Sequence, residues 1–224
     1  MNTLLLRLVG PMQSWGVQSR FSVRDTGLEP SKSGVLGLVC AALGVPREDD
    51  ATLARLTVLH MGVRVDREGR LSRDYHTALN VLKAGGGIKK TEPSSRYYLA
   101  DAAFLVGLES EDLTLLQQIY TALKNPIWPL FLGRKAFIPS ISVYLEDGLM
   151  RGMGLEDALK PWKYPYLGRG DPPEKIRLVL EDLHGSLIRP DQPLSFSERR
   201  FIPRRIRVAV VSASSSPSSA HEVI

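Results

Sequence analysis

A glycine-rich segment with neighbouring lysines is the part of this sequence best suited to binding phosphate. Residues 83–98 read KAGGGIKKTEPSSRYY, in which three consecutive glycines are followed almost at once by two lysines. The backbone N–H groups of glycine-rich loops and the ammonium groups of lysines both bind phosphate oxygens. The phosphate could belong to a nucleotide held for catalysis or to the backbone of a nucleic acid.

The spacing argues against a nucleotide-binding loop. A Walker A loop has Gly-Lys-Ser/Thr four residues after another glycine and leads directly into a helix. In GGGIKKTEPSS no glycine directly precedes a lysine, and a proline follows where the helix should begin. No G-x-G-x-x-G motif opens a helix either. Two interpretations remain: a flexible surface hairpin whose lysines aid solubility, and a mobile basic finger that orders around a phosphate backbone.

The catalytic possibility in this sequence is a metal-independent ribonuclease. His76 or its neighbour Tyr75 could act as the general base, with a nearby lysine stabilising the developing negative charge. A stacking or hydrogen-bonding role for His76 is the alternative. No pair among the four histidines has metal-ligand spacing, and the single cysteine, Cys40, cannot build a disulfide framework. We therefore expect no metal and no other cofactor.

The loop PMQSWGVQSRFSVRDT interleaves polar, aromatic and basic residues. Residues 13–15 could read or stack on unpaired bases, while Arg20 and Arg24 could contact phosphates. Alternatively, this is an ordinary loop with Trp15 packed into the core.

Basic residues recur at three further places. In PSKSG, the start of a predicted helix presents backbone N–H groups beside Lys32 and Ser33, which would form either an anion site or a simple cap. Arg134 and Lys135 lie in a turn before a predicted strand. The segment FSERRFIPRRIR concentrates arginines near the C-terminus. A solvated run of charge is the ordinary explanation, whereas Arg205 and Arg207 on the polar face of one predicted strand would form a directional basic patch.

The composition is that of a globular chain with an excess of arginine. The 224 residues carry a formal net charge of +5, and the isoelectric point is near 9.4. The 29 basic residues divide into 20 arginines and 9 lysines, and arginine both forks onto phosphate and stacks on bases. A GC-rich genome or a thermophilic host would also explain this bias. No apolar run is long enough to span a membrane, so we expect a cytoplasmic protein without membrane contact.

The apolar pattern predicts an α+β fold. We expect a strand, a helix, two strands, a helix and a strand at residues 3–10, 33–44, 61–65, 98–108, 111–124 and 135–145. This β-α-β-β-α-β order is typical of a ferredoxin-like domain, which is also the architecture of RNA-recognition (RRM) domains. A long insertion between the second and third strands, at about residues 70–97, carries the three glycines.

The chain is expected to divide into three parts. Residues 1–148 form the ferredoxin-like domain with its insertion. Residues 149–211 contain two stretches of alternating apolar residues and are predicted to form a small β-rich C-terminal subdomain. Residues 212–224 are too polar and repetitive to fold and are predicted to be a disordered tail.

Six motifs spread along residues 3 to 207 carry a resemblance to a known family. They are GPMQSWG, RDTGLEPSKSGVLGLVCAALG, DYHTA, RYYLADAAF, PIWPLFLGRKAFIPS and FSERRFIPRR. With these motifs in order, the sequence resembles the CasD-type subunits (RAMP superfamily) of the type I-E CRISPR surveillance complex, Cascade. The resemblance implies a ferredoxin-like RAMP domain with an inserted β-hairpin thumb.

The resemblance also implies a function. Such subunits hold the 5′ handle of the CRISPR RNA, cap one end of the complex, and kink the RNA with the thumb. They contact the adjacent repeated backbone subunit and lie near the large subunit, so target DNA is met only indirectly within the complex. In type I-E systems a separate endonuclease processes the precursor RNA, which implies that this chain is non-catalytic.

The residues expected to contact the RNA come from all of these segments. They are Gln13, Ser14, Trp15, Gly16, Arg20, Arg24, Lys32, Ser33, Tyr75, His76, Lys83, Lys89, Lys90, Arg96, Arg134, Lys135, Arg199, Arg200 and Arg204. Two alternatives remain open. One is a metal-independent endoribonuclease that processes precursor CRISPR RNA, and the other is a scaffold that leaves RNA contacts to other subunits.

Overall fold

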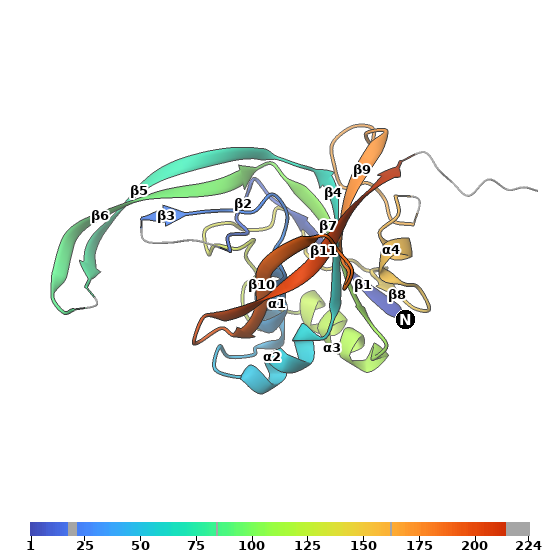
Figure 1. Cartoon of the computed structure of the whole chain (residues 1–224), viewed down its shortest axis with the longest axis horizontal. Helices are drawn as coiled ribbons and strands as arrows, with labels where there is room; N and C mark the ends of the chain where they lie inside the picture. Colours follow the sequence, from blue (N-terminus) through green and yellow to red (C-terminus); the bar gives the residue numbers. More distant parts are fainter. Residues whose placement is uncertain (18–21, 84, 162, 214–224) are drawn as a thin grey trace, which may run out of the picture.

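The protein has an α+β fold built on two antiparallel or mostly antiparallel sheets (Figure 1). The computed structural model describes residues 1–17, 22–83, 85–161 and 163–213. A seven-stranded sheet forms the body, and a four-stranded sheet extends from it. Figure 1 shows helices α1, α2 and α3 below the body, with a long hairpin reaching away on the left.

The seven-stranded sheet joins strands from both ends of the chain. Its strand order is β10-β11-β9-β4-β7-β1-β8, and every neighbouring pair is antiparallel. The strands are β1 (Asn2–Val9), β4 (His60–Arg67), β7 (Ala103–Ser110), β8 (Leu149–Met150), β9 (Lys175–Glu181), β10 (Leu187–Ser195) and β11 (Arg200–Ser212).

Both predicted helices are present as α1 and α3, and the structure adds two helices that were not predicted, α2 and α4. They are α1 (Lys32–Leu43), α2 (Asp50–Thr57), α3 (Leu113–Lys124) and the short α4 (Leu155–Ala158). The side chains of Ser31, Asp49 and Asp112 accept backbone N–H groups at the first turns of α1, α2 and α3, as N-cap residues do. Gly44 ends α1 at a φ of 71°, a left-handed conformation that glycine adopts without strain.

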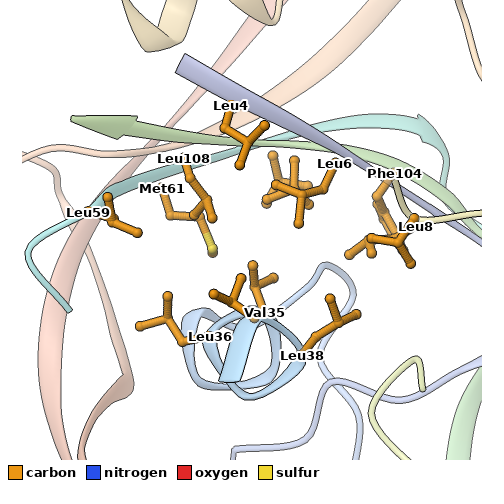
Figure 2. Packing of buried hydrophobic residues seen from close by; sticks show 14 of the residues in the cluster. Leu4, Leu6, Leu8, Val35, Leu36, Leu38, Leu59, Met61, Phe104 and Leu108 are labelled. Carbon is orange, nitrogen blue, oxygen red and sulfur yellow. The ribbon is translucent and has the colours of Figure 1, made fainter. Parts of the chain in front are cut away.

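Register aligns the apolar side chains of three adjacent strands into rows that α1 covers. The rows across β1, β7 and β4 are Leu4–Leu108–Met61, Leu6–Val106–Val63 and Leu8–Phe104–Val65, all in one buried cluster. Figure 2 shows Val35, Leu36 and Leu38 of α1 facing them. Because both faces of β1 are buried, Leu5 joins a second cluster on the opposite side with Leu155 and Leu159.

The C-terminal strands continue the main sheet. β9 pairs with β4, with Val63 opposite Val179, and β11 pairs with β9. A sheet therefore runs across the boundary proposed at residue 148, and the division into two domains stays a prediction. β11 ends at Ser212, and most of the tail predicted to be disordered, residues 214–224, lies outside the described residues.

The prediction of a strand at residues 135–145 is wrong. This segment has bends and no strand, although single backbone bonds tie it to β1: Arg7 N–H donates to Val143 O at 3.0 Å, and Ser140 N–H to Val9 O at 2.9 Å. Pro139 has no N–H to donate, which interrupts a continuous ladder. The neighbour of β1 is instead the two-residue strand β8.

The insertion between the second and third predicted strands is a long antiparallel hairpin. β5 (Arg70–Leu82) pairs with β6 (Ile88–Ala100), and β6 also pairs with β2 (Met12–Gln13) and, in parallel, with β3 (Val23–Arg24). Thirteen residues per strand correspond to a reach of about 40 Å. Gly86 and Gly87 turn the tip at φ of 88° and 78°. Order or disorder of this tip without RNA stays a prediction.

Removing the Leu6 side chain tests the core. Leu6 is fully buried between β4, β7 and α1, so Leu6→Ala should lower the free energy of unfolding by about 2–5 kcal/mol. Urea denaturation followed by circular dichroism measures this change. Val58→Ala is the control, because Val58 is 68% exposed and should shift stability by no more than about 0.5 kcal/mol. Equal effects of the two substitutions would contradict this packing.

Candidate nucleic-acid interface

Three arginines from distant parts of the sequence meet at the base of the β5–β6 hairpin; we call them the arginine cluster. Arg24 of β3 is the register partner of Arg96 of β6, so both side chains lie on the same face of this sheet. Arg134 reaches in from a turn, where its Nη2 donates to Tyr97 O at 2.9 Å and to Arg24 O at 3.3 Å. These backbone bonds hold Arg134 between the strands that carry the other two arginines.

A glycine makes this approach possible. Gly133 has a φ of 93°, and a Cβ built there would lie 1.8 Å from Ser14 O. Only a residue without a side chain allows the turn to come so close to the loop after β2. Gly133 therefore positions Arg134.

Positive charge in the cluster is only partly balanced. The pKa of Arg134 is lowered, first because burial penalises the charged guanidinium and next because Arg96 lies nearby, while the carboxylate of Asp25 acts in the opposite direction. Asp74 stands opposite Arg96 in the β5–β6 register and adds a second carboxylate. An anionic ligand such as a phosphate would relieve the repulsion among the three cations.

Aromatic and titratable side chains line the hairpin above the cluster. Tyr75 is 68% exposed, which leaves its ring free to stack on a base. His76 is the register partner of Ser94, and its Nδ1 lies 3.9 Å from a carboxylate oxygen of Asp74. Asp74, His76 and Arg96 therefore share one face of the hairpin, and Tyr75 points to the other.

The tip of the hairpin carries the predicted lysines. Lys83, Lys89 and Lys90 are all exposed. Lys89 forms an ion pair with Glu92, so part of its charge is compensated. Lys83 N–H donates to Gly87 O at 3.0 Å and closes the turn. The tip is basic and accessible, as the sequence predicted.

The loop after β1 needs a correction, because three of its predicted contact residues are buried. Trp15 is 1% exposed and packs on Gly34 of α1, which confirms the alternative of a core position. The side-chain amide of Gln13 donates to Leu8 O and Ala102 O at 3.1 and 2.9 Å and accepts from Trp15 Nε1 at 3.2 Å. Their role in this structure is to position the loop. Ser14 is buried beside them.

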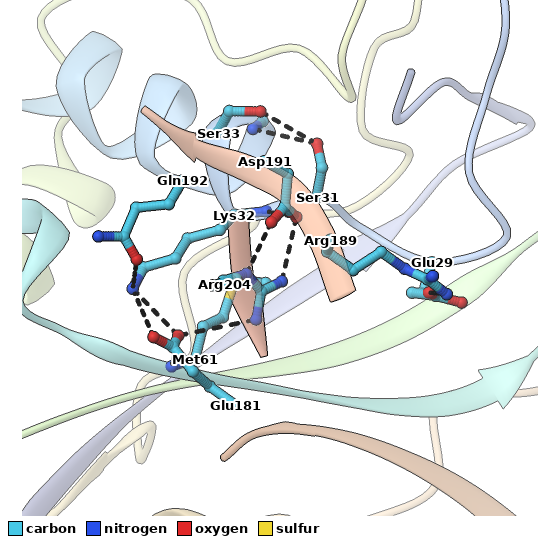
Figure 3. Close-up of polar contacts among 11 residues, drawn as sticks. Glu29, Ser31, Lys32, Ser33, Met61, Glu181, Arg189, Asp191, Gln192 and Arg204 are labelled. Atoms are coloured by element: carbon cyan, nitrogen blue, oxygen red, sulfur yellow. Dashed lines mark hydrogen bonds and ion pairs between the residues drawn. The ribbon is translucent and has the colours of Figure 1, made fainter. Parts of the chain in front are cut away.

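The anion site predicted at the start of α1 is occupied by a carboxylate of the protein itself. Lys32 N–H donates to Asp191 Oδ2 at 2.8 Å, and Lys32 Nζ pairs with Glu181 at 3.0 Å. Arg204 binds Asp191 at 2.7 Å and lies 3.7 Å from Glu181. Figure 3 shows these four side chains, the buried charge network, converging from α1, β9, β10 and β11.

Burial changes the function that these residues can have. Lys32 is 1% exposed and Arg204 is 9% exposed. Burial lowers the pKa of Lys32, against the raising effect of Glu181. Because both cations are neutralised inside the protein, the expectation that they bind phosphate is wrong for this structure. Ser33 is only half-buried, and its hydroxyl donates to Ser31 Oγ at 3.4 Å.

The remaining predicted residues are spread over the surface. Gly16 and Lys135 are exposed, and Arg20 lies outside the described residues. Arg199 and Arg200 lie where β10 turns into β11, and Arg200 pairs with Glu198. β10 and β11 belong to the seven-stranded sheet, whereas Arg24 and Arg96 lie in the other sheet. Arg73, which the sequence analysis did not include, is also exposed on β5, opposite Tyr97. Strand alternation through residues 70–82 was the signal for it.

Among the described residues, no group of three or more His, Cys, Asp or Glu side chains has a geometry for holding a metal ion. None of the helices in the described parts of the chain is long and apolar enough to cross a lipid bilayer.

Comparison with known proteins identifies the family. Residues 3–211 match the family described as CRISPR-associated protein (Cas_Cas5). The chain belongs to the Cas5 family of CRISPR-associated proteins. A curated relative, the CRISPR system Cascade subunit CasD of Escherichia coli (strain K12), is 36% identical over 146 residues, which are 59% of this chain and 65% of the relative. The match thus spans slightly less than two thirds of that relative's length.

Two solved structures resemble this Cas5-family chain along nearly its whole length. One, described as a crystal structure of a Cas protein, is 48% identical with a TM-score of 0.77, covering 94% of this chain and 95% of the other. The second comes from a CRISPR RNA-guided surveillance complex, with 34% identity, a TM-score of 0.75, and coverage of 94% and 90%.

Breaking the buried charge network should destabilise the Cas5-family fold. Asp191→Ala removes the partner of Arg204 and leaves a buried guanidinium poorly paired, which typically costs about 3–5 kcal/mol of the free energy of unfolding. Urea denaturation measures the loss.

Glu198→Ala is the matched control for this substitution. It removes a carboxylate from an exposed pair with Arg200, in which both side chains are 60% exposed, so the change should stay below about 1 kcal/mol. An Asp191→Ala protein as stable as the control would show that the network does not hold the fold.

Proposed function

We propose that this chain is a non-catalytic CRISPR RNA-binding subunit of a Cascade-type surveillance complex, where it holds the 5′ handle of the guide RNA and caps one end. The observation that carries this proposal is the arginine cluster, in which Arg24, Arg96 and Arg134 converge from three segments. Membership of the Cas5 family, and the likeness to a chain of an RNA-guided surveillance complex, support it.

The fold suits this role if the body is a ferredoxin-like RAMP domain. The chain order β1-α1-β4-β7-α3-β8 and the sheet order β4-β7-β1-β8 follow that architecture. On this interpretation the β5–β6 hairpin is the thumb, inserted between β4 and β7, and β9 to β11 are the C-terminal subdomain.

The arginine cluster would grip the phosphates of the handle. Guanidinium groups bind phosphate oxygens in a forked geometry, and the exposed ring of Tyr75 would stack on an unpaired base. Lysines at the thumb tip would neutralise phosphates where the guide segment begins. Target sequence would be read by guide pairing, so this chain meets target DNA only indirectly.

The proposed partners follow from the same role. They are the CRISPR RNA, the repeated backbone subunit and the large subunit of the complex, in the cytoplasm and without a membrane. A scaffold whose RNA contacts all come from other subunits is the competing interpretation, and RNA binding by the isolated chain separates the two.

Charge reversal in the cluster tests the grip on RNA. Arg24→Glu combined with Arg96→Glu should weaken binding of handle RNA at least about tenfold, because two phosphate contacts become repulsive. In a gel shift across a series of salt concentrations, the plot of log affinity against log salt should become less steep by about 1.4, because two phosphate contacts are lost. A scrambled handle measures specificity in the same assay.

The matched control reverses two exposed arginines on the helical side, Arg47→Glu with Arg55→Glu. This pair changes the net charge equally and should leave specific handle binding within about twofold. Lys89→Glu with Lys90→Glu tests the thumb tip in the same series. Unchanged handle binding and assembly in both the cluster and the tip variants would favour the scaffold instead.

One observation favours the alternative function of a metal-independent endoribonuclease. Asp74 and His76 lie 3.9 Å apart on the face that carries Arg96, an arrangement of base and cation that could cleave RNA without metal. Because the proposal is non-catalytic, precursor CRISPR RNA incubated with the protein in EDTA should remain intact. Cleavage that disappears in a His76→Ala variant would establish the endoribonuclease.

A further inference from the structure

A groove lies on the helical side of the molecule, between α1 and α3. Its volume is about 690 Å³, and its walls include Leu43 at the end of α1, Leu113 and Thr121 on α3, and Ile127 in the following loop. Figure 1 shows α1 and α3 below the main sheet, and the β5–β6 hairpin extending away to the left. The proposed contacts with RNA at the arginine cluster and the thumb do not use this groove.

The lining follows one stripe along α3. It contains positions 113, 114, 117, 118, 121, 122 and 125, which recur every three or four residues and so share one side of the helix. α3 buries its opposite side through Leu116, Ile119 and Leu123. A groove that follows a helix over three turns has the shape to accept a second helix laid alongside it.

The rim of the groove is apolar and rigidly held. Ile127, which lines the groove, is 65% exposed, and its neighbour Trp128, outside the lining, is 44% exposed. Their backbone N–H groups donate to Ala42 O and Ala41 O at 3.0 and 3.1 Å, which fixes the loop to the end of α1. Ile127 therefore offers the groove an exposed apolar side chain on a backbone that is already fixed.

The groove lining carries a single positive charge, that of Arg151. Arg151 is the one charged residue in its lining, and no acidic side chain is among the residues described there. Arg151 is exposed and has no ion pair or side-chain hydrogen bond within the described ranges. Glutamine, asparagine and threonine supply the rest of its polar surface. A single cation beside an apolar surface is too little charge for a nucleic acid and matches one carboxylate on an otherwise apolar partner.

We propose that this groove docks an amphipathic helix of another protein subunit of the same complex. The helix would place apolar side chains at i, i+3 and i+4 spacing against Leu43, Leu113 and Ile127, and would pair one Asp or Glu with Arg151. The identity of the partner as a subunit of that complex rests on the function proposed above, whereas the chemistry of the docked helix follows from the groove itself.

The experiment uses the full-length chain with an affinity tag in its native host, so that the whole complex is purified with it. Thr121→Arg places a bulky cation in the groove without harming α3, because Thr121 is exposed and arginine is a good helix former. Arg151→Glu reverses the charge that the partner would recognise. Val58→Arg is the matched control at the end of α2, outside the groove lining.

Two measurements are made on each variant. Native mass spectrometry quantifies how much of the chain is assembled with other protein subunits, and a gel shift measures handle RNA binding by the isolated chain. We expect Thr121→Arg and Arg151→Glu to reduce assembly at least about tenfold while leaving RNA binding and the melting temperature unchanged. Val58→Arg should behave as the wild type in all three.

A photo-crosslinking amino acid at Gln118, an exposed position in the groove lining, identifies the occupant. A cross-link to an amphipathic helix with an acidic residue in another subunit supports the proposal. A cross-link to RNA, to a second copy of this chain, or to no protein overturns it, as does normal assembly of Thr121→Arg. If the wild-type chain does not bind handle RNA, the proposed RNA-binding function is wrong. The groove proposal is still tested in that case, because the cross-link identifies its occupant independently.

Discussion

The buried charge network between α1 and the C-terminal strands is the interaction on which the arrangement of the body depends. Lys32 begins α1, Glu181 ends β9, Asp191 lies in β10 and Arg204 in β11. Four charges removed from water cost several kcal/mol each unless they satisfy one another. Two cations and two carboxylates within 2.7 to 3.7 Å meet that condition, and these contacts tie α1 to β9, β10 and β11.

A second set of polar contacts attaches the hairpin sheet to the body. The side-chain N–H of Gln13 donates to carbonyls near the end of β1 and just before β7, and its oxygen accepts from the buried ring of Trp15. Trp15 in turn packs against Gly34 of α1. These few side chains link the base of the hairpin to the core and to α1. The positions of the arginines in the cluster therefore depend on the packing of the core.

The two sides of the molecule differ in chemistry. The hairpin side exposes arginines, lysines and a tyrosine, which suits a flexible polyanion with unpaired bases. The helical side exposes an apolar groove that is lined by Ile127 and carries one cation, Arg151, which suits a protein surface. A chain that holds RNA on one side and a neighbouring subunit on the other would join guide and protein in a single assembly.

The sequence by itself determined the elements whose signals are local. An apolar run that stops at Gly44 was sufficient for α1, apolar periodicity was sufficient for α3, and the glycine-rich insertion between two strands was sufficient for the hairpin, because these patterns depend on neighbouring residues. The family motifs were also readable in order along the chain.

Tertiary structure decided which charged side chains are available to a ligand. In sequence, Lys32 and Arg204 are indistinguishable from Arg24 and Arg134. In the structure, Glu181, 149 positions away, neutralises Lys32, and Asp191, 13 positions away, neutralises Arg204. Arg24 and Arg134 remain at the surface or near it. Burial and pairing of a charge depend on contacts between distant segments, and no local pattern contains that information.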